Sequence, residues 1–120
     1  SHKWLQVKFC YNAYMKSFSQ RVLEAALAIP RGRVTTYGHI ARASGGGGQS
    51  ARSVTSILGK AYDAGEKRIP FHRIVFAGGK VWLNNEYAAR RLKLYKQEGI
   101  EVDKKTSKIK NFDDVLFTYK

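Results

Sequence analysis

The sequence predicts a single, mainly α-helical domain with a small β-hairpin, arranged as a winged helix-turn-helix-like fold. Apolar residues recur at helical spacing in several separate segments, and glycines 45–48 divide two of them. Ala77–Lys80 carries turn residues between two short apolar runs, which is typical of a hairpin that would serve as a wing. Helix, turn and helix is the outline of a helix-turn-helix. We assign residues 15–120 to this one domain and residues 1–14 to an N-terminal extension, because Met15 could be a native start.

The first two predicted helices have clear local start and stop signals. Ser17 or Ser19 is a suitable N-cap for a helix that begins near Phe18, and Pro30 and Gly32 end it. A brief β-branched run follows. Thr36 then caps a second, short helix over 37–43.

A third helix is predicted from Ser50, its N-cap, to about Tyr62, with an apolar stripe of Val54, Ile57, Leu58 and Ala61. Residues 74–76 read as a short buried strand. Pro70 precedes it and restricts the backbone, so Phe71 and His72 would lie on a stiff segment that leaves the core. The alternative is an ordinary core strand with a surface histidine.

The last third of the chain predicts a fourth helix, a charged hairpin and an aromatic segment. Asn84 or Asn85 would cap the helix over 86–97, and Gly99 would close it in the C′ position. Residues 100–110 carry charges that favour an exposed hairpin, and residues 112–119 would pack back on the domain.

The charge balance points to a polyanionic partner. Lys and Arg number 22 against 9 acids, which gives a net charge of +13 in 120 residues. Nucleic acid is the usual partner of such a chain, and no basic amphipathic anchor or long apolar run favours a membrane. One cysteine, Cys10, excludes an internal disulfide framework and a cysteine zinc site. We expect a reducing location, either the cytoplasm (nucleoid) or the nucleus, and no signal peptide is evident.

Most enzyme chemistries lack support in the sequence. The three histidines lie far apart without companions at ligand spacing, so we expect no metal and no cofactor. The glycine run lacks the Lys-Ser/Thr of a phosphate loop, and no nucleophile elbow is present. The third helix instead offers short polar groups around a long arginine, a pattern that suits a nucleic-acid groove: Gln49, Ser50, Arg52, Ser53, Thr55 and Ser56. A solvated helix face is the simpler alternative.

Four segments resemble the O6-alkylguanine-DNA alkyltransferases, in the order in which that family carries them. Residues 29–41 are similar to its "IPxGxVxTYGxIA" run, and residues 50–54 to its "xARxV" recognition helix. Residues 69–75 resemble the active-site signature "IPCHRVV", and residues 94–102 the closing "LxxEGxxV". The resemblance spans Phe18 to about Val102 and implies the DNA-binding fold of this family.

One departure changes the activity that the resemblance implies. The acceptor cysteine of the family falls on Phe71, while His72 and Glu98 occupy its helper positions. Alkyl transfer needs a nucleophilic thiolate, and a phenyl ring has no lone pair to offer. The chain therefore resembles the alkyltransferase-like proteins, which lack the cysteine, and no catalytic residue is expected. These proteins usually carry Trp at this place, so Phe is a variation that affects pocket size.

The resemblance also implies how the domain meets DNA. The third helix would lie in the minor groove, Arg52 would enter the base stack, and Tyr37 would crowd the adjoining phosphate. The expected DNA-binding residues are Tyr37, Gln49, Ser50, Ala51, Arg52, Thr55 and Ser56. The expected alkylguanine pocket consists of Tyr37, Phe71, Val75, Trp82, Leu83 and Asn84. Tyr37 as a plain core aromatic is the alternative, and Asn84 replaces a basic residue that helps some relatives hold the base.

The expected function is non-enzymatic recognition of O6-alkylguanine in double-stranded DNA by base flipping, with a signal to nucleotide excision repair. The protein would act as a monomer. One alternative is a winged helix DNA-binding regulator that is indifferent to lesions. Another is an alkyltransferase inactivated by a Cys-to-Phe substitution at position 71, whether natural or engineered.

Overall fold

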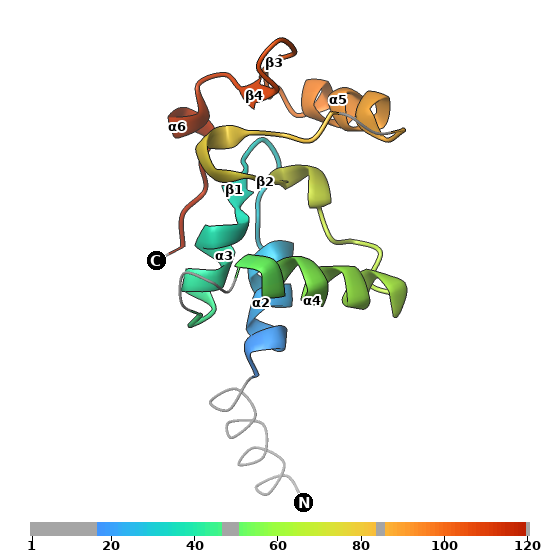
Figure 1. Cartoon of the computed structure of the whole chain (residues 1–120), viewed down its shortest axis with the longest axis vertical. Coiled ribbons are helices and arrows are strands. Elements are labelled where there is room, and N and C mark those ends of the chain that lie inside the picture. Colours follow the sequence, from blue (N-terminus) through green and yellow to red (C-terminus); the bar gives the residue numbers. More distant parts are fainter. Residues whose placement is uncertain (1–16, 47–50, 84–85, 120) are drawn as a thin grey trace, which may run out of the picture.

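The computed structural model describes residues 17–46, 51–83 and 86–119, and it arranges them in two parts joined by a short parallel sheet (Figure 1). Three helices form one part: α2 (Phe18–Leu27), α3 (Tyr37–Ala43) and α4 (Ala51–Asp63). Helix α5 (Ala88–Gln97), strands β3 (Val102–Asp103) and β4 (Lys108–Ile109) and the short helix α6 (Phe112–Val115) form the other. The proposed extension, residues 1–14, lies outside the described residues. No helix in the described ranges is long and apolar enough to cross a membrane.

The three-helix part follows its local signals. Ser17, rather than Ser19, is the N-cap of α2, and it forms a capping box with Gln20. Thr36 caps α3 by accepting a hydrogen bond from the backbone N–H of His39 at 3.0 Å. Val54 and Leu58 of α4 are fully buried against α2 and α3. These predictions are confirmed, whereas the Ser50 cap lies outside the described residues.

The turn predicted at residues 77–80 is present, but the pairing of its two arms as strands of a hairpin is wrong. Strand β2 (Ile74–Val75) does not pair with residues 81–83, but lies parallel to β1 (Thr35–Thr36), with Thr35 opposite Ile74. The chain does turn at 77–79, and the Phe76 N–H donates to the Lys80 carbonyl at 2.9 Å. Beyond the turn, Lys80 pairs with Lys108 of β4. The apolar runs do need partners, but segments far away in the sequence provide them, and local turn signals cannot reveal this.

Helix α5 begins at Ala88, two residues later than expected, with Tyr87 at its N-cap and no side-chain cap. The predicted caps, Asn84 and Asn85, lie outside the described residues. Gly99 follows the helix with a φ of +74°, as expected for the C′ position. The antiparallel hairpin of β3 and β4 is also confirmed.

The C-terminal segment connects the two parts. Leu116 bridges Val34 in parallel, and the Phe117 N–H donates to the Val34 carbonyl at 2.7 Å. The Tyr119 hydroxyl then reaches α2 and donates to the Ala25 carbonyl at 2.6 Å. The aromatic segment thus packs back on the domain, as predicted. Each part has its own cluster of buried apolar residues, one around Val54 and the other around Tyr95.

Candidate functional site

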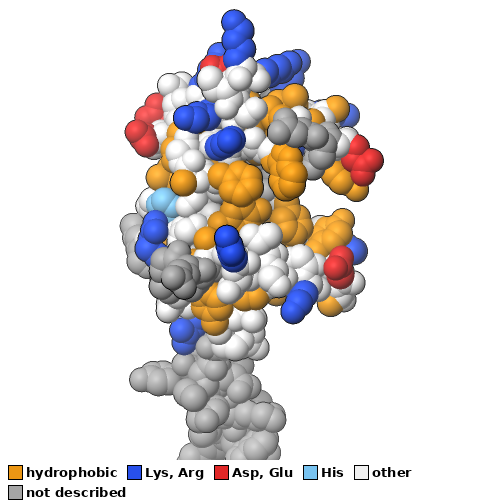
Figure 2. All heavy atoms as spheres, in the orientation of Figure 1, with side chains coloured by type: hydrophobic (Ala, Val, Ile, Leu, Met, Phe, Trp, Pro, Cys, Tyr) orange, Lys and Arg blue, Asp and Glu red, His pale blue; other side chains and the backbone are white. Residues whose placement is uncertain are grey.

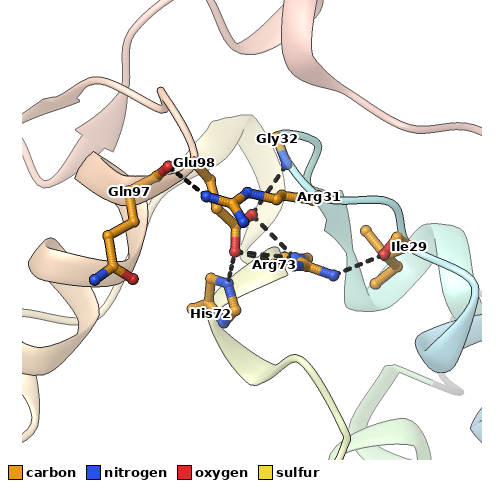
Figure 3. A network of polar contacts seen from close by, with 7 residues as sticks. All are labelled: Ile29, Arg31, Gly32, His72, Arg73, Gln97 and Glu98. Atoms are coloured by element: carbon orange, nitrogen blue, oxygen red, sulfur yellow. Dashed lines mark hydrogen bonds and ion pairs between the residues drawn. The ribbon is translucent and has the colours of Figure 1, made fainter.

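A buried carboxylate, Glu98, joins three distant segments of the chain (Figure 3). Its Oε1 atom accepts a hydrogen bond from the Gly32 N–H at 3.0 Å and another from Arg73 Nε at 3.0 Å. Its Oε2 atom accepts from Arg73 Nη2 at 3.0 Å and lies 2.5 Å from His72 Nε2. The Arg73 guanidinium also donates from Nη1 to the Ile29 carbonyl at 3.0 Å. One ion pair therefore holds the end of α5, the turn before β1 and the segment before β2 together.

The environment of Glu98 determines its charge. Burial alone would raise the pKa of this carboxyl, but hydrogen bonds from Arg73, Gly32 and His72 outweigh burial and lower the pKa to about 2. Glu98 is consequently ionised at neutral pH and can only accept hydrogen bonds. The proton between it and His72 must then reside on His72 Nε2. The Glu98 carboxylate thus has protein partners on both of its oxygens.

Phe71 lies beside an open cavity of about 580 Å³ between α4 and α5. Residues Phe71–Arg73 form a single 3-10 turn, closed by an Arg73 N–H to Pro70 carbonyl bond of 2.9 Å. The half-buried Phe71 ring packs edge-on against Tyr62 of α4, with 5.7 Å between ring centroids. Figure 2 shows this region as a hollow with hydrophobic side chains on its walls. Its other side is lined by Tyr87, the N-cap residue of α5, and by Leu94 of α5. A flat aromatic ligand in this cavity could stack on, or pack edge-on against, these aromatic rings.

Cations surround the same cavity. The Lys67 ammonium lies 3.9 Å from the centre of the Tyr62 ring, and the side chains of Arg90 and Arg91 lie along the opposite wall. Arg68 is paired with Glu66 at 3.0 Å. The cavity thus combines aromatic walls with positive charge at its edge, a pairing that suits a base attached to a phosphate backbone.

The predicted pocket residues are divided between two cavities. Tyr37, Val75 and Trp82 line a small cavity of about 40 Å³ that does not include Phe71. Arg91 borders both cavities, so the two are neighbours. Leu83 packs on the buried cluster around Tyr95 and lines neither, and Asn84 lies outside the described residues. The parallel pairing of β1 and β2 explains the division, because Tyr37 follows the end of β1 whereas Phe71 precedes the start of β2, so the two residues lie at opposite ends of the strand pair.

The predicted groove-facing side chains lie on α4 and at the start of α3. Arg52, Thr55 and Ser56 are exposed, Ala51 is half-buried, and Gln49 and Ser50 lie outside the described residues. Thr55 Oγ1 donates back to the Ala51 carbonyl at 3.4 Å. The Tyr37 ring packs against Phe76 at 5.7 Å, and burial raises the pKa of its hydroxyl. Tyr37 is therefore neutral and part of the packing, with its edge at the small cavity.

Sequence reasoning missed two features of this site. Arg73 belongs to the segment 69–75 that resembles the family's active-site signature, but its role was not predicted. Only the structure shows that it donates hydrogen bonds to both Glu98 and the Ile29 carbonyl. A charged residue inside an otherwise apolar run was the available signal, since such a residue needs a buried partner. Tyr62 and the α5 arginines gave no comparable signal. In the described ranges, no group of three His, Cys, Asp or Glu side chains could hold a metal ion.

Comparison with known families agrees with this architecture. The family model for the DNA-binding domain of 6-O-methylguanine DNA methyltransferase matches residues 17–100. The chain belongs to this family, and within it to the alkyltransferase-like proteins.

Curated relatives include a DNA base-flipping protein of Escherichia coli, 35% identical over 86 residues, which make up 72% of this chain and 64% of that protein. The chain thus matches slightly less than two thirds of that relative. A DNA base-flipping protein of Vibrio parahaemolyticus is 33% identical over 88 residues, 73% of this chain and 85% of its own length.

Solved structures show the same fold. S. pombe Atl1, crystallised with damaged DNA containing O6-carboxymethylguanine, superposes with a TM-score of 0.68 at 27% identity, over 88% of this chain and 98% of Atl1. The O6-methylguanine methyltransferase of Mycobacterium tuberculosis gives a TM-score of 0.52 at 31% identity, over 69% of this chain and 48% of the enzyme. The fold class predicted from the sequence is confirmed.

Proposed function

We propose that this protein recognises O6-alkylguanine in double-stranded DNA and holds the damaged base outside the helix without repairing it. The observation that carries the proposal is Phe71, which lies in an open aromatic cavity beside an intact His72–Glu98 pair. The names of its relatives support it, since two are DNA base-flipping proteins and a third was crystallised with damaged DNA.

Alkyl transfer to Phe71 is not feasible, because transfer requires a nucleophile at the place where the alkyl carbon arrives. The Phe71 ring offers none, and its neighbour His72 is engaged by Glu98 through Nε2. We therefore infer a non-enzymatic role. Binding would rest on stacking against Phe71, Tyr62 and Tyr87 and on the cations at the edge of the cavity.

The approach to DNA would use the exposed face of α4. We infer that α4 lies in the minor groove, where the small Thr55 and Ser56 allow close contact and Arg52 fills the space left by the flipped base. Extrusion costs a few kcal/mol, less for a poorly paired base such as alkylguanine. This difference in cost would contribute to lesion preference.

A protein that shields a lesion without removing it depends on a later process. We propose that the complex is passed to nucleotide excision repair, in the cytoplasm (nucleoid) or the nucleus, and that the protein binds as a monomer. A duplex distorted by a flipped base and an inserted side chain is a structure that such a process could detect.

The direct test compares binding with chemistry on the same DNA. We expect tighter binding to a duplex with one O6-methylguanine than to the matched duplex, measured by fluorescence anisotropy. Intact-mass spectrometry after incubation should show no added methyl group. A mass gain of one methyl would refute the non-enzymatic role, and equal affinity for both duplexes would favour a winged helix regulator indifferent to lesions.

Arg52→Ala tests the mode of binding. We expect the affinity ratio of lesion over matched duplex to fall roughly fivefold or more, because the inserted guanidinium replaces lost stacking. Lys60→Ala is the matched control, since Lys60 is also exposed on α4 but near its C-terminal end. An unchanged ratio in Arg52→Ala, or an equal loss in the control, would contradict the role given to Arg52.

A further inference from the structure

Two large aromatic side chains stand exposed on the part of the molecule that α4 does not reach. Trp82 is 54% exposed and Phe76 is 45% exposed. Both line a surface hollow of about 450 Å³ together with Lys80, Val81 and Ser107. Neither borders the Phe71 cavity, so the function proposed for that cavity leaves them unexplained.

These rings are exposed on a rigid frame. The Trp82 carbonyl accepts a hydrogen bond from Arg91 Nη1 at 2.5 Å, and the Phe76 ring packs against Tyr37 at 5.7 Å. The turn between them is closed by the Phe76 N–H to Lys80 carbonyl bond. Gly79 in this turn lies so close to Phe112 that an added Cβ would come within 2.9 Å of its ring. The aromatic pair is therefore preorganised for a ligand.

Two lysines place positive charge beside the rings. Lys80 and Lys108 pair directly across an antiparallel bridge, and both are exposed. Residues that pair directly point to the same face, and like charges in such a pair destabilise the sheet. Asp103 pairs directly with Lys108 from the other strand of the hairpin and offsets part of its charge, and its Oδ1 also accepts from the Lys105 N–H at 2.9 Å. A bound anion would further reduce the repulsion between the two lysines.

We propose that Trp82 and Phe76 form a second site that stacks an unpaired nucleobase, with its phosphate between Lys80 and Lys108. Exposed aromatic rings next to lysines are the features that bind single-stranded nucleic acid. No carboxylate lines the described part of the hollow, and this disfavours a basic protein segment. The proposal rests on DNA as the ligand of the proposed function, and adds that the protein holds a second unpaired base apart from the Phe71 cavity.

The test uses a short single-stranded oligothymidylate, which carries no lesion, and the full chain. Stacking on an aromatic ring contributes about 1–3 kcal/mol per base, so we expect Trp82→Leu to weaken binding roughly fivefold or more. Trp82→Phe should retain most of the affinity, because a ring remains. Lys80→Gln should weaken binding and make it less dependent on salt.

The control is Leu27→Ala, which removes another exposed apolar side chain, on α2, and should leave binding unchanged. Circular dichroism checks that each variant folds. If Trp82→Leu binds like the wild type, or Trp82→Phe is as weak as Trp82→Leu, the site does not stack a base and the proposal is overturned. An unchanged affinity of Lys80→Gln would overturn the phosphate position.

Failure of this proposal can be told apart from failure of the proposed function. The ratio of affinities for O6-methylguanine duplex and matched duplex is measured in parallel for the wild type and for Lys80→Gln. A normal ratio with no stacking effect overturns the second site and leaves lesion recognition in place. A ratio near one overturns lesion recognition, and the oligothymidylate series then judges the second site alone.

Discussion

Glu98 holds its place in the fold through a fully satisfied set of hydrogen bonds. Its side chain is only 6% exposed, yet it is ionised because Arg73, His72 and the Gly32 N–H all donate to it. A buried pair of this kind adds little compared with apolar packing, but it is expensive to break. Loss of one partner leaves a charge without compensation.

Stability should therefore fall in acid because of Glu98. Its pKa in the folded protein is about 2, below the ordinary 4.5, so its contribution is present above pH 4.5 and is lost as the pH falls toward 2. We expect Glu98→Gln to lower the free energy of unfolding by about 3 kcal/mol at pH 7 and by much less at pH 2. Urea unfolding at both pH values measures this.

Glu101→Gln is the control, because Glu101 is exposed and near Glu98 in the sequence. Its unfolding free energy should change by less than about 0.5 kcal/mol at either pH. A loss in Glu98→Gln that is the same at pH 7 and pH 2 would show that the carboxylate charge does not contribute.

At the scale of single residues, the sequence predicted which residues lie at the candidate site better than it predicted which side chains contact one another. The pattern around Phe71 and His72 placed both residues on one stiff segment, and the structure has them in one 3-10 turn. It could not show that Trp82 and Phe71 line different cavities, since that depends on the pairing of β1 with β2. Which side chains share a cavity is decided by contacts between distant segments.

The turn at 77–79 positions Phe76 and Trp82 and depends on its second glycine. Gly78 and Gly79 both have positive φ, at +76° and +86°. An added Cβ at Gly78 would meet open space, whereas one at Gly79 would clash with Phe112. Both glycines therefore adopt a left-handed backbone conformation, but only Gly79 is also packed against a neighbouring side chain.

Replacing each glycine by alanine separates the two effects. Gly78→Ala should cost about 1 kcal/mol of unfolding free energy, from backbone strain alone. Gly79→Ala should cost about 3 kcal/mol, because the clash with Phe112 adds to the strain. Denaturant unfolding gives both values, and equal costs would mean that Phe112 moves aside freely.

Helices were predicted well at the scale of elements, and strands were not. The bounds of α3 follow from Thr36 and the residues after it, and those of α2 from Ser17 and Pro30, all of which are local signals. Strand β2 looked like one arm of a hairpin because the turn residues follow it. Its actual partner, β1, lies about forty residues earlier, and no local pattern reports such a pairing.

The whole molecule carries its positive charge over both parts. The net charge is +13, yet α4 holds only Arg52 and Lys60 against Asp63. Lysines and arginines of α5 and the β3–β4 hairpin supply much of the remainder, and Figure 2 shows such side chains over both parts of the visible face. Under the function proposed above, general attraction to DNA would come from the domain as a whole, and discrimination from the Phe71 cavity.

Salt should separate these two contributions. We expect the affinity for matched duplex to fall steeply with salt, with a slope near −0.9 for each phosphate contacted. The ratio of lesion over matched affinity should change less than about twofold, because stacking on Phe71 and Tyr62 releases no counterions. Titrations at several salt concentrations measure both. A ratio that collapses along with the affinity would place discrimination in the phosphate contacts.

The parallel bridge between Val34 and Leu116 has a consequence for how the chain folds. Closing a loop of about eighty residues costs conformational entropy before the contacts at its ends can stabilise it. Contacts between residues so far apart in the sequence therefore slow folding. The α2–α4 helices can assemble from neighbours in the sequence, so they should form early. The strands that set Tyr37 against Phe76 and Phe71 against Tyr62 would be completed last, and the nascent chain would acquire its helical framework before it could accommodate any base.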